Sequence, residues 1–419
     1  MAKSTPRLVR RNLTDRLVEA LSDTPVVMIN GPRQSGKTTL AQQVISAGFD
    51  ATYVTLDQAG PRSFALTDPE GFIDQFDRPV VIDEVQRAPE LFPALKLAVD
   101  RNRHPGRFLL TGSADVLLLP KVSESLAGRI EILTLWPFSQ SELEGRKDSF
   151  VDAVFAPALN LKVDESHDLR AEVIQRAVRG GFPEAVARQD AARRGAWFDS
   201  YTATVIDREL PTIADISDRS RLPTLVRLLA SRSMSILNMA ELSRSTAIPH
   251  SSLLRYVGLL ELLFFLQRIP SWSGNLGRRL VRRPKVTLSD TGLIAELEQI
   301  DPRRMELDPV LSGPLVESFA ATELRKLVGW SVKRPALFHF RSHLGAEVDL
   351  VLEQTDGRLV GIEVKAASTA RTDDLGGLRE LAAVSGKKFV RGIVLYTGRN
   401  ATSLGANMMA LPMSALWKL

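Results

Sequence analysis

The sequence contains no cysteine. Disulfide bonds, a thiol nucleophile and thiolate metal sites are therefore excluded, and the composition fits a reducing compartment. Long hydrophobic runs are also missing: the most apolar stretch, residues 258–267, is too short to span a bilayer and includes Glu261. We expect neither a signal peptide nor a membrane anchor, and a cytoplasmic location. Histidine is scarce and its spacing matches no zinc motif; the five residues are His104, His167, His250, His339 and His343.

The 419 residues have the composition of a globular protein, with 44% hydrophobic and 25% charged residues. This length predicts about three domains. The chain has 54 Lys and Arg against 49 Asp and Glu, and the net charge of +5 is too small for a chain that binds a polyanion over its whole surface. A local basic patch is compatible with this balance, and the positions of the arginines decide whether the chain has one.

Three regions follow one another along the chain. Up to about residue 138, short apolar runs alternate with helical patterns, which predicts an α/β domain with a doubly wound parallel sheet. Helical patterns then run to about residue 268, and a second α/β unit begins near residue 312 with a helix over 315–328. The Arg-rich residues 270–314 are expected to form a hinge. The expected strands are 26–30, 51–56, 79–83, 107–111 and 130–135 in the first region and 337–341, 347–353, 359–365 and 389–396 in the last.

A phosphate-binding motif follows the first of these strands. The sequence from Gly31 to Thr38 fits G-x-x-x-x-G-K-[ST] and opens a helix, as the mechanism requires. Backbone N–H groups of this loop and of the helix N-terminus would face a polyphosphate, Lys37 would neutralise it, and Thr38 would bind Mg²⁺. The sequence therefore predicts ATP and Mg²⁺ as cofactors. The expected nucleotide-binding residues of the motif are Gly31, Pro32, Arg33, Gln34, Ser35, Gly36, Lys37, Thr38 and Thr39.

Further polar residues come at the ends of the following strands. Asp83 ends an apolar strand and is expected to join the magnesium site, while Glu84 is expected to polarise the attacking water. Thr111 and Ser113 end the next strand, where they would sense the γ-phosphate or form an ordinary strand-end turn. Arg129 precedes the last strand and is expected either to act on phosphate, in the same chain or in a neighbouring subunit, or to be an ordinary surface arginine.

These motifs together resemble a known family. Gly-Pro-Arg-Gln-Ser-Gly-Lys-Thr-Thr, Val-Ile-Asp-Glu-Val-Gln, Leu-Thr-Gly-Ser, Leu-Ala-Gly-Arg, Trp-Pro-Phe-Ser and Gly-Gly-Phe-Pro are similar to the prokaryotic AAA-type ATPases that carry a C-terminal domain of unknown function related to PD-(D/E)XK nucleases. The resemblance covers nearly the whole chain. It implies ATP hydrolysis and an ASCE-type sheet in which one strand separates the Walker B strand from the P-loop strand. The chain departs from the family at the sensor strand, where AAA proteins commonly carry Asn and this chain has Thr111 and Ser113.

The middle region predicts a winged helix. Two helices separated by Pro249 are followed by two strands over 264–269 and 285–289. Met239, Leu242, Leu253, Leu254 and Val257 are expected to pack the helices together. Tyr256 is expected to face a groove together with the proposed nucleic-acid contacts. The segment from Arg268 to Lys285, which includes parts of both strands, contains six basic residues and no Asp or Glu, which favours binding to nucleic-acid phosphates. A winged helix that contacts protein is the alternative. The expected nucleic-acid contacts are His250, Ser251, Ser252, Arg255, Arg278, Arg279, Arg282 and Arg283.

Carboxylates in the last region predict a metal site. Asp349 and Glu363 lie on adjacent expected strands, and Lys365 shares a strand face with Glu363. Two such carboxylates can hold a divalent cation, and a lysine beside them can stabilise a phosphorane. Glu317 takes the place of the helix glutamate in the family resemblance. We therefore expect Asp349 and Glu363 as metal ligands and Glu317, Asp349, Glu363 and Lys365 as catalytic residues of a PD-(D/E)XK-like α/β domain, active or degenerate.

These observations predict four domains: a P-loop ATPase domain over 1–138, a helical lid or linker over 139–236, a winged helix over 237–295 and a nuclease-like domain over 296–419. The main functional prediction is an ATPase that couples its nucleotide state to DNA binding. The alternatives are an ATP-gated, metal-dependent DNA endonuclease and a nucleotide-controlled adaptor that contacts proteins. The sequence leaves open whether the chain forms homo-oligomers.

Overall fold

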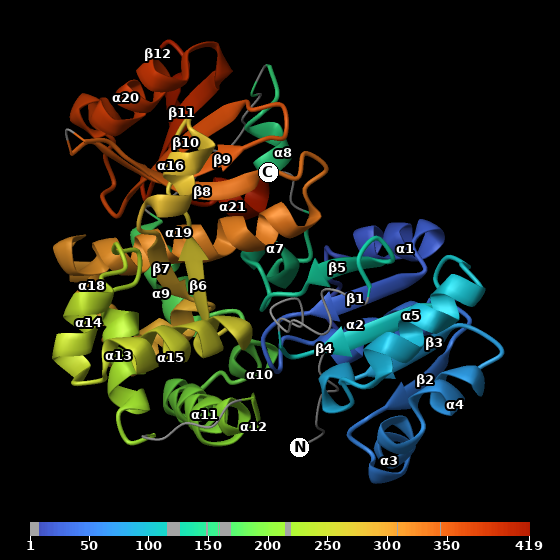
Figure 1. The fold of residues 1–419 in the computed structure, drawn as a ribbon. Helices are drawn as coiled ribbons and strands as arrows, with labels where there is room; N and C mark the ends of the chain where they lie inside the picture. Colours follow the sequence, from blue (N-terminus) through green and yellow to red (C-terminus); the bar gives the residue numbers. More distant parts are fainter. Residues whose placement is uncertain are drawn as a thin grey trace, which may run out of the picture. The chain divides into compact units, whose positions relative to one another are not determined.

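The computed structural model describes residues 8–114, 126–147, 150–157, 159, 169–213, 219–307, 309–343 and 345–419. The chain forms two compact units. Among the described residues, the N-terminal unit comprises those within 10–137 and 259–265, and the C-terminal unit comprises those within 8–9, 138–258 and 266–419. Figure 1 shows the elements of both. No helix in the described part of the chain is both long and apolar enough to cross a lipid bilayer.

The N-terminal unit is built on a parallel five-stranded sheet in the order β2-β3-β4-β1-β5. The strand that ends in Asp83 is therefore separated from the P-loop strand by one strand, as the family resemblance implies. The expected strands all form, with bounds that differ by one residue at most. They are β1 (Val26–Asn30), β2 (Thr52–Thr55), β3 (Val80–Asp83), β4 (Phe108–Gly112) and β5 (Ile130–Thr134).

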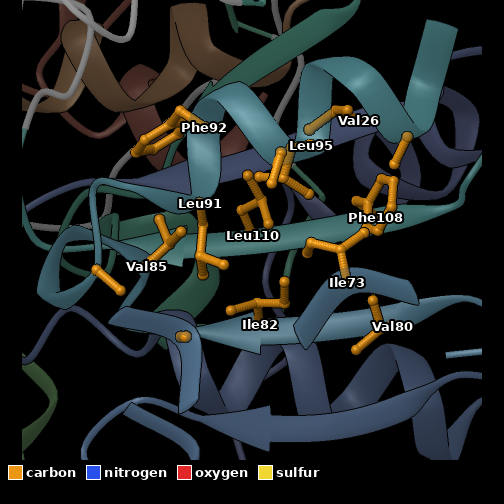
Figure 2. Packing of buried hydrophobic residues seen from close by; sticks show 14 of the residues in the cluster. Val26, Ile73, Val80, Ile82, Val85, Leu91, Phe92, Leu95, Phe108 and Leu110 are labelled. Atoms are coloured by element: carbon orange, nitrogen blue, oxygen red, sulfur yellow. The ribbon is translucent and has the colours of Figure 1, made fainter. Parts of the chain in front are cut away.

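Alternate residues of the central strands face opposite layers of helices. Val26, Val80 and Phe108 belong to a buried cluster with α4 (Pro69–Asp74) and α5 (Leu91–Arg101), part of which is drawn in Figure 2. The intervening residues Val27, Val81 and Leu109 belong to a second cluster with α1 (Thr14–Asp23) and α2 (Lys37–Ser46). Continuous apolar strands are needed here because both faces of the sheet are covered.

The helical region of the C-terminal unit ends in the expected helix pair and antiparallel strands. The strands β6 (Leu266–Ile269) and β7 (Lys285–Leu288) pair with each other. The face assignment of the second helix is wrong at two positions: Leu254 is 48% exposed, whereas Tyr256 is buried. The helices before β6 are α7 (Gln140–Leu143), α8 (Phe150–Ala153), α9 (Arg170–Arg179), α10 (Pro183–Val186), α11 (Ala191–Thr204), the π-helix η3 (Val205–Glu209), α12 (Leu210–Ile213), α13 (Leu222–Ser231), α14 (Met239–Thr246) and α15 (His250–Leu262).

The hinge expected over 270–314 is wrong, because this segment is largely folded. It contains α16 (Leu276–Val281), β7, α17 (Thr291–Leu297), α18 (Pro302–Leu307) and the start of α19 (Pro309–Trp330). Asp290 caps α17 by accepting from the backbone N–H of Gly292 at 2.9 Å, and it also accepts from Gly181 N at 2.7 Å. The Gly-Gly-Phe-Pro segment is therefore held against the start of α17.

A mixed six-stranded sheet in the order β12-β13-β11-β10-β9-β8 completes the C-terminal unit. Only the pairs β10·β11 and β11·β13 are parallel. The sequence prediction named no strand after Tyr396 and so missed β12 and β13. The strands are β8 (Ala336–Arg341), β9 (Glu347–Glu353), β10 (Leu359–Lys365), β11 (Phe389–Tyr396), β12 (Thr402–Gly405) and β13 (Met408–Pro412), and α20 (Gly376–Ser385) packs on the sheet.

Candidate functional site

The P-loop connects β1 to α2 with backbone conformations that few side chains tolerate. Gly31 has φ 139°, and a Cβ at this position would lie 2.3 Å from the carbonyl oxygen of Leu135. Gly36, which precedes α2, has φ 99°, and Gln34 also has a positive φ of 60°. The two motif glycines are thus required by the path of the loop itself, because L side chains rarely adopt these angles.

Two basic side chains, those of Lys37 and Arg11, donate hydrogen bonds to backbone carbonyl groups of the loop. Lys37 is only 4% exposed, and its Nζ donates to the carbonyl oxygens of Gly31 at 3.0 Å and Pro32 at 2.8 Å. Arg11 donates to the carbonyl of Ser35 at 2.8 Å and to that of Trp136, beyond the end of β5, at 2.6 Å. Arg11 therefore ties the loop to the neighbouring strand, a role that sequence reasoning missed because 24 residues separate Arg11 from Ser35.

Asp83 lies at the centre of a hydrogen-bonded group at the end of β3. Its Oδ1 accepts from the hydroxyls of Thr38 at 2.9 Å and Thr111 at 2.5 Å, and its Oδ2 accepts from the hydroxyl of Tyr53 at 2.9 Å. Burial and the adjacent Asp83 carboxylate raise the pKa of Tyr53 above its usual value, so Tyr53 stays a hydrogen-bond donor. The structure thus brings together Thr38 and Asp83, the two residues expected to hold Mg²⁺.

Glu84 follows Asp83 in a left-handed conformation with φ 59°. Its backbone N–H donates to Thr111 Oγ1 at 3.1 Å, and Gln86 Nε2 donates both to the Glu84 carboxylate and to Ser113 Oγ, the latter at 3.0 Å. Thr111 and Ser113 thus contact the two acidic residues or their partner, and their expected role as a γ-phosphate sensor or an ordinary strand-end turn stays a prediction. Sequence reasoning gave no role to Gln86, although it belongs to the Val-Ile-Asp-Glu-Val-Gln motif.

Arg129 lies where the parallel strands of this sheet begin, whereas the P-loop lies where β1 ends. It precedes β5, and its carbonyl accepts from the backbone N–H of Val26 at the start of β1. Its Nε pairs with Asp100 at 2.6 Å. The expectation that Arg129 acts on phosphate in the same chain is therefore wrong, because the length of the parallel strands separates the two positions.

The acidic residues of the C-terminal unit converge as expected, but around a lysine that the sequence analysis did not place there. Lys285, on β7, is 3% exposed, and its Nζ lies 2.6 Å from Glu347 Oε1 and 3.2 Å from Asp349 Oδ1. Asp349 Oδ2 also accepts from the backbone N–H of Val364 at 3.0 Å. Lys365 pairs with Glu363 at 3.0 Å.

Two carboxyl groups of this cluster hold protons more strongly than usual. Burial, with the Asp349 charge, raises the pKa of Glu317 to about 8 and that of Glu363 to about 7, while Lys285 opposes both shifts. Burial and the Lys285 charge lower the pKa of the nearby His339 to about 4, so this histidine is neutral near pH 7. The cluster thus limits its negative charge by protonation and by Lys285.

These residues do not fit a divalent cation. An ion bound by Asp349 would lie about 2.0–2.6 Å from its oxygens and therefore within a few ångströms of the Lys285 ammonium, which would repel it. In the residues that the structure describes, no group of three or more Asp, Glu or His side chains is arranged to hold a metal. The expectation that Asp349 and Glu363 are metal ligands therefore finds no support in this geometry.

The residues expected to contact nucleic acid lie in different environments. Arg279 is 14% exposed and pairs with Glu353 through both terminal nitrogens, at 2.5 and 2.8 Å, so it neutralises an acid of its own chain and is not part of a free basic surface. Arg283 is exposed and Arg282 half-buried, whereas the side chain of Arg278 lies outside the described part. On α15, His250, Ser251 and Arg255 are exposed and Ser252 is half-buried.

Comparison with protein-family models matches an AAA domain over residues 23–144. It also matches two domains of unknown function, DUF8612 over 170–304 and DUF4143 over 312–416. Two mycobacterial proteins, "Uncharacterized protein Mb2031c" of Mycobacterium bovis and "Uncharacterized protein Rv2008c" of Mycobacterium tuberculosis, are each 32% identical over 405 residues. The alignment covers 96% of this chain and 83% of each relative.

Two solved structures are also similar to this chain. The Walker-type ATPase paby2304 of Pyrococcus abyssi has a TM-score of 0.43 at 16% identity, covering 70% of this chain and 95% of that one. A variant of RuvB from Thermotoga maritima has a TM-score of 0.30 at 21% identity, covering 62% of this chain and 90% of that one.

Proposed function

Because the chain belongs to the same family as the two mycobacterial proteins and its N-terminal region matches the AAA domain, we propose that it binds ATP with Mg²⁺ and hydrolyses it. One observation carries the proposal. The hydroxyl of Thr38 in the P-loop helix lies 2.9 Å from Asp83, and Glu84 comes next on the same sheet edge. This arrangement supports a phosphate-binding loop, a magnesium-binding pair and a base for water within one unit.

In this proposal each residue has a separate task. Backbone N–H groups of the P-loop and the N-terminus of α2 bind the phosphates, and Lys37 neutralises their charge. Thr38 and Asp83 would hold Mg²⁺, which would supply positive charge against the phosphates when bound. Glu84 orients the attacking water and takes its proton, and Gln86 fixes the Glu84 carboxylate while Thr111 fixes its backbone.

Two substitutions separate binding from turnover. Lys37→Ala removes a cation that faces ground-state phosphate, so nucleotide binding should be lost or severely weakened. Glu84→Gln keeps the shape of the side chain but removes the base, so binding should persist while turnover falls by about 10²-fold or more. Fluorescent-nucleotide binding and phosphate release measure the two effects, with Lys96→Ala and Glu90→Gln at and near α5 as controls. Turnover in Glu84→Gln equal to that of the wild type would contradict the assignment.

For the C-terminal unit we propose recognition in place of cleavage. The Lys285 ammonium among Glu347 and Asp349 supports a fixed, charge-balanced cluster and disfavours a metal-dependent endonuclease. This leaves the DNA-coupled ATPase and the nucleotide-controlled adaptor as the two finer hypotheses. A winged helix formed by α14, α15, β6 and β7 is part of both.

A further inference from the structure

A small basic groove lies in the C-terminal unit, separate from the carboxylate cluster. It has a volume of about 230 Å³, and its lining includes Arg282, Arg283, Arg341 and His343 but no Asp or Glu. Backbone contacts fix its two walls to each other, since Trp272 N donates to the carbonyl of His339 at 2.6 Å and Ser271 bridges to His339. The groove is therefore a preformed feature between the segment that leads into β7 and the end of β8.

Arg282 and Arg283 have no carboxylate partner among the described residues, whereas Arg341 lies opposite Glu347 on the neighbouring strand and its charge helps to lower the pKa of Glu347. Arg282 donates to the carbonyl of Arg341 at 2.8 Å and lies 3.2 Å from His343 Nε2, and no ion pair within the described ranges involves Arg282, Arg283 or Arg341. The nearby Glu347 is bonded to Lys285 at 2.6 Å. No acid of the lining balances the positive charge of Arg282 and Arg283, so an anionic ligand would stabilise the groove.

We propose that this groove binds the phosphodiester backbone of a nucleic acid strand. Guanidinium groups donate to phosphate oxygens in a planar, bidentate geometry, and Ser271 and Ser342 add hydroxyl donors to the lining. A volume of about 230 Å³ is smaller than sites that enclose a whole small molecule, commonly about 300–1,000 Å³. The groove therefore suits one or two phosphates of a chain that continues over the surface, and contacts of this kind bind without reading sequence.

Arg282 and Arg283 belong to the nucleic-acid contacts expected from the sequence, whereas Arg341 does not, and the groove can be tested separately from the contacts expected on α15. The groove variant is Arg282→Ala, Arg283→Ala and Arg341→Ala combined. The helix variant is Arg255→Ala, and the charge-matched control combines Arg103→Ala, Arg193→Ala and Arg227→Ala, three exposed arginines elsewhere. Fluorescence anisotropy with labelled single-stranded and duplex DNA, measured over a range of salt concentrations, gives the affinity and its salt slope. ATP turnover of the groove variant checks that the chain is folded.

We expect the groove variant to bind at least about tenfold more weakly. The slope of log K against log salt should fall by about 1–2, because the groove holds one or two phosphates and each phosphate contact contributes about 0.7–0.9. The control should stay within about twofold of the wild type. Absence of DNA binding by the wild type, an equal loss in the control or in Arg255→Ala, or an unchanged slope would each overturn the inference. Calorimetric titration with inorganic phosphate forms a second arm, and binding of free phosphate as tight as that of DNA would also overturn it.

Discussion

Lys285 shows how one buried residue changes the function expected of a site. The sequence places Asp349, Glu363 and Lys365 on two strands, which is the pattern of a metal-dependent nuclease, and the strands form with the expected bounds. The pattern does not reveal that a lysine 64 residues before Asp349 reaches the same carboxylate. Such a contact depends on how β7 packs against the C-terminal sheet, so no local signal could predict it.

Protonation of Glu317 should make the stability of the chain depend on pH. Its pKa is about 8 in the folded protein, against about 4.3 in an unfolded chain, so the folded state binds this proton more tightly. The stabilisation is complete below about pH 4 and is lost as pH rises toward 8. We therefore expect Glu317→Gln to gain stability relative to the wild type between about pH 5 and pH 8, by at least about 1 kcal/mol.

Urea unfolding at a series of pH values measures this difference. Glu184→Gln, on the surface of α10, serves as the control because this carboxylate is exposed. Its free energy of unfolding relative to the wild type should change little over the same range. A Glu317→Gln curve that stays parallel to that of the wild type would show that Glu317 is ionised in the folded chain.

In the nucleotide site, the residues fall into two groups by how they could be found. The P-loop residues, Asp83 and Glu84 follow from spacing, because a strand, a Gly-rich turn and a helix are consecutive in sequence. Tyr53, Gln86 and Arg11 complete the site through hydrogen bonds that join separate elements. A tyrosine on a strand or an arginine before a helix has many other uses, so its sequence neighbourhood gave no indication of these contacts.

At the scale of elements, the apolar pattern predicted the strands well and the irregular segments poorly. The five strands of the N-terminal unit and the first four of the C-terminal sheet were predicted because each is a continuous apolar run between turn residues. The segment 270–314 was misinterpreted as a hinge because its Arg, Gly and Pro content resembles that of a linker. Burial of β7 and α17 overrides that composition.

Asp290 stabilises the folded part of the segment 270–314 through hydrogen bonds to backbone N–H groups. It is fully buried, caps α17 and accepts the backbone N–H of Gly181. Asp290→Ala would remove the cap and leave the Gly181 N–H without its acceptor, at a cost of about 2–4 kcal/mol in the free energy of unfolding. Asp190→Ala, which removes an exposed cap of α11 in the same unit, should cost about 1 kcal/mol.

Chemical denaturation of the two variants gives the comparison. Asp290→Asn should recover part of the loss, because an amide oxygen still accepts one of the two N–H groups. Equal losses in Asp290→Ala and Asp190→Ala would mean that the contact with Gly181 contributes nothing beyond an ordinary cap.

At the scale of the whole molecule, the basic residues have two kinds of environment that the small net charge does not reveal. Some basic residues are internal partners, as Lys285 is to Glu347 and Arg279 to Glu353, while Arg282 and Arg283 have no carboxylate partner among the described residues. The total charge of +5 could not separate these classes, because burial and pairing decide them. We therefore expect a divalent cation to bind at Thr38 and Asp83 and not at Asp349 and Glu363.

Thermal melting tests this expectation. Without nucleotide, millimolar Mg²⁺ or Mn²⁺ should leave the melting temperature unchanged, because the Lys285 ammonium occupies the region between Glu347 and Asp349 that a cation would need. With ATP present, Mg²⁺ should raise the melting temperature of the wild type, since a ligand bound only by the folded state stabilises it, but not that of Lys37→Ala. A rise with Mn²⁺ alone that Asp349→Asn abolishes, or DNA cleavage that Glu363→Ala abolishes, would establish a metal-dependent nuclease. In that case Lys285 would have to leave the cluster when the cation binds, and the charge-balanced cluster would be a resting state of the enzyme.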